Sequence, residues 1–361
     1  MTRYIRYGAL LGAMLVGAGC GDSTTPEESN FLPQPEYIPV SQAPAFTTTL
    51  TGVAWDPESF FHQVYFCLGA GPACPMPPYL SEGLPLYLNA SVSGAAVQPF
   101  DPLLAGPPPA NPLVGQPVNS DGMGIWVFPG VPSPHNRPAP YLMFNAGVGS
   151  LPPVQIGPPF PKVAESEYLP TLTLRPITIN NNSSCTGLEA AQISKKGVLE
   201  AVAKHLTATG TPTTVEDFIN PGRYAGVFVV WLYEAGNPIQ RKAADGITVE
   251  HSTGRILSLS WEFPGSLPAA DNQATRGFYV TPNAAISDIG LYVVLVPQGA
   301  DVPPTMSFLF KDSRTDEASL RPWTFPPVTV GFGPGVVNFG GFQMFYPLPP
   351  IPPPPAACVF Q

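Results

Sequence analysis

An all-β fold is predicted for this chain, in the form of two antiparallel β-sandwich modules joined by one helix. Short runs rich in valine, threonine and aromatic residues alternate with glycine, proline and asparagine along most of the sequence. The 50 prolines and 35 glycines punctuate a chain that is 44% hydrophobic, which is too apolar for a disordered protein. Only residues 187–206 place apolar side chains at helical spacing.

Residues 1–19 are predicted to form a signal peptide. Arg3 and Arg6 provide a basic start, and a short apolar core, residues 7–16, follows them. This core is well below the roughly 20 apolar residues that span a bilayer. Small residues then lead directly to Cys20. An ordinary secretory signal with a cysteine nearby is the alternative interpretation.

The order Gly17-Ala18-Gly19-Cys20 resembles the lipobox of bacterial lipoproteins, although Gly17 stands where that family usually has leucine. The resemblance implies lipidation of Cys20, with a diacylglycerol on its sulfur and an acyl chain such as palmitate on the new N-terminus. Two or three acyl chains are enough for stable anchoring. Gly21 rather than aspartate follows Cys20, which favours the outer membrane, at its periplasmic face or at the cell surface.

Residues 20–45 are acidic, polar and rich in proline, and we expect a flexible tether there. The first sandwich module is predicted at residues 46–180. Its predicted strands, read from β-branched and aromatic runs, are TTTLTGVAW, HQVYFCLG, LPLYLNASV, GIWVF, APYLMFNAG and YLPTLTLRPITI.

A turn at residues 119–122, Asn-Ser-Asp-Gly, precedes the GIWVF strand. The succession LTGVAWDPES, SVSGAAV, NSDGMGIWVFPGVP and PYLMFNAG resembles the carboxypeptidase regulatory-like, or transthyretin-like, β-sandwich. The resemblance implies a non-catalytic accessory or display module. A calcium site at Asp121 is the rival interpretation, but one carboxylate is far short of the six to eight oxygens that calcium takes.

A helical linker is predicted at residues 181–214, with the helix at 187–206. The second sandwich module is predicted at residues 215–346. It includes the buried run YAGVFVVWLYE and a hairpin through the turn at residues 252–254, and the strands GFYVTP, IGLYVVLVP, TMSFLF and VVNFGGFQMFYP complete it. The proline-rich end, residues 347–361, is predicted to be an extended strap.

Four cysteines remain once Cys20 is assigned to lipid. An even number in an exported chain predicts disulfide bonds. Cys67 and Cys74 flank a short Gly/Pro turn and are expected to pair, which leaves Cys185 to pair with Cys358. Three pairings are possible, and four reduced thiols are a further alternative. The six-residue spacing of the first two cysteines is unlike a zinc knuckle, so no metal site is predicted.

The charge of the chain excludes one class of partner. Without the two arginines of the signal peptide, 14 basic and 25 acidic residues remain, a net charge of −11. A chain this acidic has no basic surface for nucleic acid. No catalytic motif, phosphate-binding loop or pair of histidines at metal-ligand spacing is present in the sequence, so we expect neither enzyme activity nor a cofactor.

Two functions remain open. The first is a structural or protein-interaction lipoprotein that presents its two modules to an envelope protein. The second is a carbohydrate-binding surface lipoprotein, in which exposed aromatic rings such as Trp126 and Trp323 stack on a polysaccharide. The alternative for these tryptophans is that they belong to the core.

Overall fold

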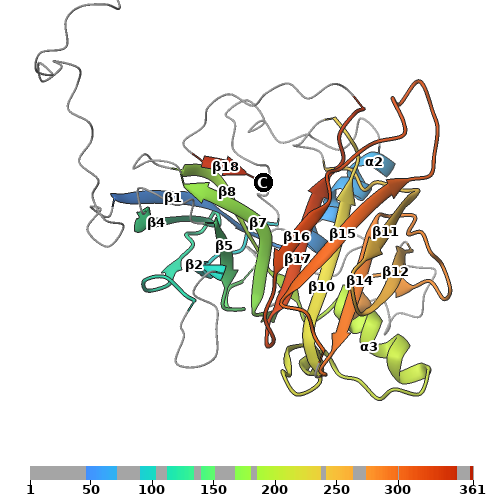
Figure 1. The fold of residues 1–361 in the computed structure, drawn as a ribbon, viewed down its shortest axis with the longest axis horizontal. Helices are drawn as coiled ribbons and strands as arrows, with labels where there is room; N and C mark the ends of the chain where they lie inside the picture. Colours follow the sequence, from blue (N-terminus) through green and yellow to red (C-terminus); the bar gives the residue numbers. More distant parts are fainter. Residues whose placement is uncertain are drawn as a thin grey trace, which may run out of the picture. The chain divides into compact units, whose positions relative to one another are not determined.

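The structure is a computed structural model, which describes residues 46–70, 90–102, 112–133, 140–150, 167–179, 185–236, 241–262, 274–299, 301–347 and 358–360 (Figure 1). All of them belong to one unit of the chain, Pro44–Gln361. Strands dominate these residues, as the sequence predicts. None of the helices in these ranges is long and apolar enough to cross a membrane.

A large mixed sheet is the centre of the fold. Its strands in spatial order are β13 (Phe278–Val280), β12 (Arg255–Trp261), β14 (Leu291–Pro297), β10 (Tyr224–Tyr233), β17 (Val337–Gln343), β7 (Thr171–Ile179), β5 (Pro140–Asn145), β2 (Ala96–Phe100) and β3 (Val118–Asn119), with β18 (Cys358–Phe360) beside β7. Figure 1 shows β10, β14 and β17 side by side.

The sheet combines parallel and antiparallel pairs around β10. All ten residues of β10 are buried, as expected of a continuous apolar run covered on both faces. β10 pairs antiparallel with β14 and parallel with β17, and β17 pairs parallel with β7. The predicted pairing was antiparallel throughout. Since β7 lies in the first predicted module and β17 in the second, both modules contribute strands to this one sheet.

A second sheet makes the predicted sandwich. Its strands are β11 (Ile247–His251), β15 (Thr305–Asp312) and β16 (Val328–Gly331). One hydrophobic core combines Phe228 and Tyr292 of the large sheet with Phe308 and Phe310 of the small one. Alternate residues of β15 are buried, which is the pattern of a strand with one face on a core.

The predicted hairpin through residues 252–254 is wrong. β11 pairs with β15, whereas β12 pairs with β13 and β14. The turn therefore carries the chain from one sheet of the sandwich to the other. Gly254 has a φ of +92°, and a Cβ there would lie 2.6 Å from the carbonyl oxygen of Leu295, so only glycine fits this crossing.

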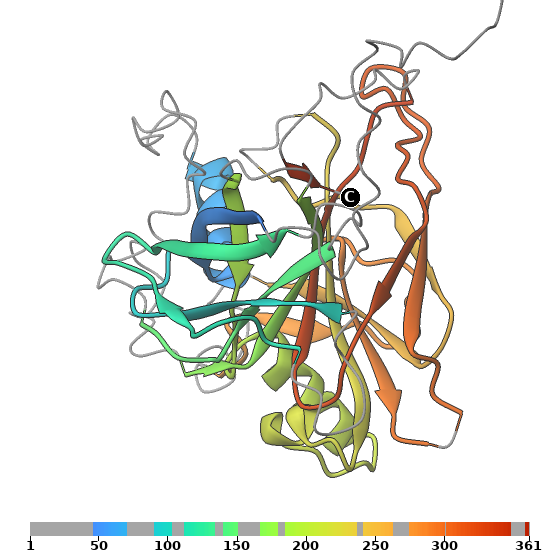
Figure 2. The same ribbon diagram turned by 60° about the vertical axis from the view of Figure 1, so that its left-hand side comes forward.

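Two helices cover the opposite face of the large sheet. They are α2 (Pro57–Ala70) and α3 (Val198–Ala208), and the 3₁₀ turn η5 (Val215–Ile219) follows α3. Their apolar side chains join Val227, Val229 and Trp231 of β10 in a second core. Figure 2 shows α3, in yellow-green, near one end of the long strands.

A three-stranded sheet forms the other layer of the N-terminal part. It contains β4 (Ile125–Ser133), β1 (Phe46–Trp55) and β8 (Cys185–Ala191), with β1 and β8 parallel. Its core joins side chains of β1, β4 and β8 to side chains of β2 and β5 of the large sheet. The short strands β6 (Tyr168–Leu169) and β9 (Ile193–Ser194) pair with each other.

Two predicted elements differ in type from the observed ones. The run HQVYFCLG, predicted as a strand, belongs to α2, because Asp56 and Pro57 begin a helix just before it. The helix predicted at residues 187–206 begins only at Val198. Residues 185–191 form β8 instead, because they pair with β1, and Gly197, with a φ of +103°, interrupts the helical pattern.

Candidate functional site

Asp56 begins a cluster of buried charged side chains at the start of α2. Its Oδ1 accepts the backbone N–H groups of Glu58, at 2.9 Å, and Ser59, at 3.0 Å. Its Oδ2 accepts the hydroxyl of Ser59 at 2.8 Å. Asp56 is therefore the N-cap of α2, with Pro57 at the first helical position, where proline loses no hydrogen bond.

Glu58 extends from α2 to the start of a second helix. The N–H of Val198, the first residue of α3, donates to Glu58 Oε1 at 3.3 Å. Gly197 precedes it, and a Cβ on Gly197 would lie 1.8 Å from Glu58 Oε2. The absence of a side chain at Gly197 therefore makes room for a carboxylate from α2 to cap α3.

Arg276 joins the two carboxylates. Its Nη1 donates to Asp56 Oδ2 at 3.1 Å and to Glu58 Oε2 at 3.2 Å. The hydroxyl of Tyr168, on β6, donates to Asp56 Oδ2 at 3.2 Å. His62 Nε2 lies 3.0 Å from the carbonyl oxygen of Arg276, so this nitrogen carries the proton. We call these five residues the acid–arginine cluster.

Burial dominates the electrostatics of the acid–arginine cluster. Asp56 and Glu58 are fully buried, His62 is 2% exposed and Arg276 is 7% exposed. Burial raises the pKa of Glu58 to about 8; the charge of Arg276 opposes this shift, and that of Asp56 adds to it. Burial lowers the pKa of His62 to about 3, and the charge of Arg276 adds to that shift.

The chemistry of the acid–arginine cluster is structural. Its acids hold the starts of α2 and α3 together with the segment before β13, and its side chains are sealed from solvent. A catalytic acid or base must reach a substrate, directly or through one water. The described contacts instead direct these carboxylates to backbone N–H groups and to Arg276.

A second charged contact lies between β7, β8 and Arg241. Arg175 Nη1 forms an ion pair with Glu189 Oε1 at 2.9 Å, and Arg241 binds the same carboxylate through both of its terminal nitrogens. The guanidinium of Arg241 also lies 5.0 Å from the ring centroid of Trp55. This network fastens Arg241 to the N-terminal sheet.

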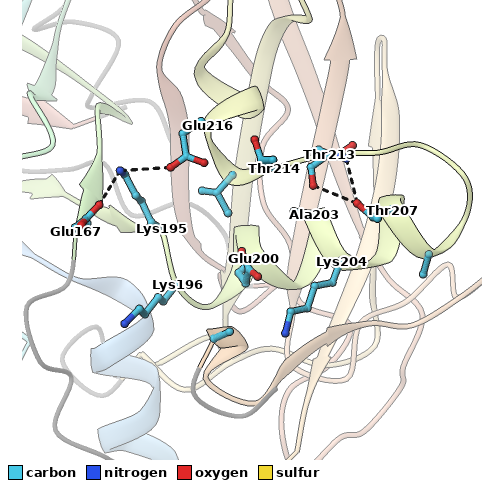
Figure 3. Close-up of a pocket in the computed structure, with 13 residues that line it drawn as sticks. Glu167, Lys195, Lys196, Glu200, Ala203, Lys204, Thr207, Thr213, Thr214 and Glu216 are labelled. Carbon is cyan, nitrogen blue, oxygen red and sulfur yellow. Dashed lines mark hydrogen bonds and ion pairs between the residues drawn. The ribbon is translucent and has the colours of Figure 1, made fainter. Parts of the chain in front are cut away.

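A groove of about 710 Å³ lies between α3 and η5. Lysines and glutamates from both sides line it, and we call it the lysine groove (Figure 3). Lys195 occupies one end, where its Nζ lies 2.8 Å from Glu167 and 3.4 Å from Glu216. In Figure 3, Lys196 and Lys204 extend away from these pairs, on either side of Glu200.

A second groove, of about 630 Å³, contains Trp323 and Arg321. Arg321 covers the indole ring, 3.9 Å from its centroid, and the indole N–H donates to the carbonyl oxygen of Ser319 at 2.9 Å. Asp245 binds Arg314 at 2.5 Å and Arg321 at 3.2 Å. The face and the N–H of Trp323 are thus engaged within the chain.

The prediction that Trp126 and Trp323 are exposed is wrong. Trp126 is 1% exposed and belongs to the core between β1, β4 and β2, and Trp323 is 6% exposed. The GIWVF pattern correctly places Trp126 on a strand but does not tell which face of it meets solvent. The alternative, that they are core residues, is confirmed.

The other predicted residues have mixed outcomes. Asp121 Oδ1 accepts the backbone N–H groups of Met123, at 2.8 Å, and Ile125, at 2.9 Å, so it shapes the turn before β4. Cys185 is disulfide-bonded and buried. Cys20, Cys74 and the side chains of Cys67 and Cys358 lie outside what the structure describes, so lipidation and both pairings stay predictions.

Sequence reasoning missed the acid–arginine cluster. His62 stands at metal-ligand spacing from no other histidine of the sequence, and Arg276 belongs to no recognisable motif. Asp56-Pro57 was the one available sign, because Asp before Pro is typical of a helix start. It predicts the cap but not the arginine, which lies 220 residues further along the chain.

Comparisons with known proteins add little beyond this geometry. No protein-family model matches the chain, and no characterised protein matches its sequence. Among solved structures, the chain is similar to a streptococcal ancillary pilin, with 8% identity and a TM-score of 0.19 over 83% of this chain and 62% of the pilin. It is also similar to the full-length major pilin SpaD of Corynebacterium diphtheriae, with 9% identity and a TM-score of 0.18 over 88% and 100% of the two chains. The major pilin subunit BcpA of Bacillus cereus gives 7% identity and a TM-score of 0.19 over 82% and 99%. This chain thus spans about 62% of the length of the streptococcal pilin, and its fold assignment rests on the strand pairings described above.

Proposed function

We propose that this chain is a non-catalytic lipoprotein of the cell envelope, which presents its β-rich unit to an envelope protein. The observation that supports the proposal is that the buried and paired charges described above bind other parts of the same chain. Asp56, Glu58 and Arg276 bind one another and two helix starts, and the charges of Glu189, Asp245 and Lys195 are engaged in ion pairs. Such contacts support a rigid scaffold rather than a reaction centre.

The tryptophans favour the same function over carbohydrate binding. Stacking on a sugar needs an accessible ring face, and both Trp126 and Trp323 are buried. Surface apolar side chains are present elsewhere, among them Val127 on β4, at 51% exposure, and Phe345, at 52%. Residues of this kind suit contact with a protein partner.

Mild detergent extraction followed by purification of the intact chain tests the display role. We expect a stable envelope protein to be recovered with it, and we expect no retention on insoluble polysaccharide. Retention on polysaccharide without a protein partner would overturn the proposal in favour of the carbohydrate-binding alternative.

The anchor is the second part of the proposal. We infer that Cys20 carries the lipid, supported by the Gly17-Ala18-Gly19-Cys20 lipobox, and that Gly21 directs the protein to the outer membrane. Two or three acyl chains would hold the protein firmly, because each buried CH₂ contributes about 0.8 kcal/mol.

Replacing Cys20 with alanine is expected to abolish incorporation of a labelled palmitate analogue. The variant should also move from the membrane fraction to the soluble fraction, since no acyl chain remains to bury. Ser23→Ala, three residues away in the tether, is the matched control and should keep label and membrane location. An unlabelled wild-type protein would contradict the anchor.

A further inference from the structure

The acid–arginine cluster holds more negative than positive charge. Asp56 and Glu58 share one guanidinium nitrogen, Arg276 Nη1, at 3.1 and 3.2 Å, and all three side chains are at most 7% exposed. With both acids ionised the cluster carries one uncompensated charge in the interior, which is costly. With one acid protonated, the remaining carboxylate and the guanidinium balance.

The hydrogen bonds decide which acid holds the proton. Asp56 accepts five donors: the N–H groups of Glu58 and Ser59, the hydroxyls of Ser59 and Tyr168, and Arg276. Among the described residues, Glu58 accepts two donors, the N–H of Val198 and Arg276. Donors stabilise the ionised form of an acid, so the proton goes to Glu58, the acid with fewer of them.

Glu58 lies between two helices, so a change in its protonation affects the contact between them. Its carboxyl group connects α2 to the start of α3, and the N–H of Gly197 in turn donates to the carbonyl oxygen of Ala274 at 2.8 Å. Phe61, also on α2, packs on two aromatic rings of the core. Its ring centroid lies 4.9 Å from that of Trp231 and 5.5 Å from that of Phe278. Loosening this junction uncovers aromatic core.

We propose that the acid–arginine cluster is a pH-sensitive latch, which holds α2 against α3 while Glu58 is protonated and loosens when alkaline solution removes that proton. The proton passes to hydroxide or buffer base, and two buried carboxylates then share the single positive charge of Arg276. The titratable and charged groups that face Glu58 among the described residues are Asp56, His62 and Arg276, with Tyr168 behind Asp56.

The latch has a defined pH window. The pKa of Glu58 is about 8 in the folded protein against an ordinary value of 4.5, so its stabilising contribution is complete below pH 4.5 and is lost as the pH rises through 8. The pKa of His62 is lowered from 6.5 to about 3, so its contribution is complete above pH 6.5 and is lost as the pH falls through 3. The two slopes oppose each other between pH 4.5 and 6.5.

Among the described groups with a shifted pKa, Glu58 is the one that titrates between pH 6.5 and 8. The other resolved shifts belong to acids that titrate in acid solution, to His205, whose pKa is lowered, and to tyrosines, Lys195 and arginines, which titrate at higher pH. One proton released on opening changes the opening equilibrium constant about tenfold per pH unit well below the folded-state pKa, and at pH 8 about half of the closed protein has already lost that proton, so we expect a rise of about 15-fold from pH 6.5 to 8.

Amide hydrogen exchange of the full chain tests the latch. Opening constants for residues 60–62 and for Val198, corrected for the intrinsic rise of exchange with pH, should increase about 15-fold from pH 6.5 to 8 and level off above it. Glu58→Gln should remove this rise. Glu216→Gln, at an exposed acid of η5 whose side chain is 63% exposed, is the matched control and should keep it.

A second measurement needs no substitution, in case Glu58→Gln fails to fold. The ¹³C chemical shift of the Glu58 carboxyl should titrate with a midpoint near 8. A midpoint near 4.5, or opening constants that stay flat between pH 6.5 and 8, would overturn the latch. Neither result would bear on the lipid at Cys20 or on the partner of the β-rich unit.

Discussion

Replacing Arg276 with methionine is expected to lower the free energy of unfolding by about 3–5 kcal/mol, because removal of one partner leaves buried charge uncompensated. Arg276 is the cation that the structure places against Asp56 and Glu58, at 3.1 and 3.2 Å. Methionine keeps much of the volume but supplies no charge and no donor. Urea unfolding of wild type and variant at one pH measures the difference.

The matched control for Arg276 is Arg314, an exposed arginine in an ion pair. Its guanidinium lies 2.5 Å from Asp245, but the side chain is 54% exposed. Surface pairs of this kind contribute up to about 1 kcal/mol. Arg314→Met should therefore cost far less than Arg276→Met. Equal losses for the two variants would show that the acid–arginine cluster is no more important to stability than a surface pair.

Gly197→Ala is expected to cost about 2–3 kcal/mol, from two separate causes. The φ of +103° disfavours any residue with a Cβ, by about 1–2 kcal/mol. The new Cβ would also lie 1.8 Å from Glu58 Oε2 and 2.7 Å from its carboxyl carbon, so the carboxyl group must move and α3 loses its cap, worth about 1 kcal/mol.

Gly210 separates these two causes. It follows α3 with a φ of +92°, and no atom lies within 4 Å of a Cβ built there. Gly210→Ala therefore has the backbone cost without the collision. Urea unfolding should show the larger loss for Gly197→Ala, and equal losses would contradict the role of Gly197 in admitting Glu58.

The sequence predicts the strands better than their partners. The runs that became β10 and β14 were identified from continuous apolar residues, which a strand buried on both faces requires. The pairing of β11 and β12 was wrong because a Ser-Thr-Gly turn suits both a hairpin and a crossing between sheets. The local sequence does not distinguish a hairpin from a crossing between sheets, because the packing of the whole sandwich decides between them.

The errors over helices have a related cause. Residues 62–69 contain valine and aromatic residues, which favour strands, yet the cap at Asp56 begins a helix that includes them, and Phe60, Phe61 and Val64 of this helix pack in the core beside β10. Residues 187–191 have helical spacing, but parallel pairing with β1 makes them a strand. In both places tertiary contacts outweigh intrinsic propensity.

The candidate site was beyond sequence reasoning for a simpler reason. Its members come from α2, β6, the start of α3 and the segment before β13, and the ion pair of Arg276 with Asp56 spans 220 residues. An aspartate followed two residues later by a glutamate is common at the start of helices, so this pair does not indicate a charged cluster. Only the folded chain shows that one arginine serves both acids.

No lysine or arginine occurs between Arg6 and Arg137, so the early part of the polypeptide supplies no cation of its own for Asp56 and Glu58. A ribosome must add more than two hundred further residues before their counter-ion exists. Until then the first layers cannot close around their acids. The buried charges near the start of the chain are thus balanced only after Arg276 has been made.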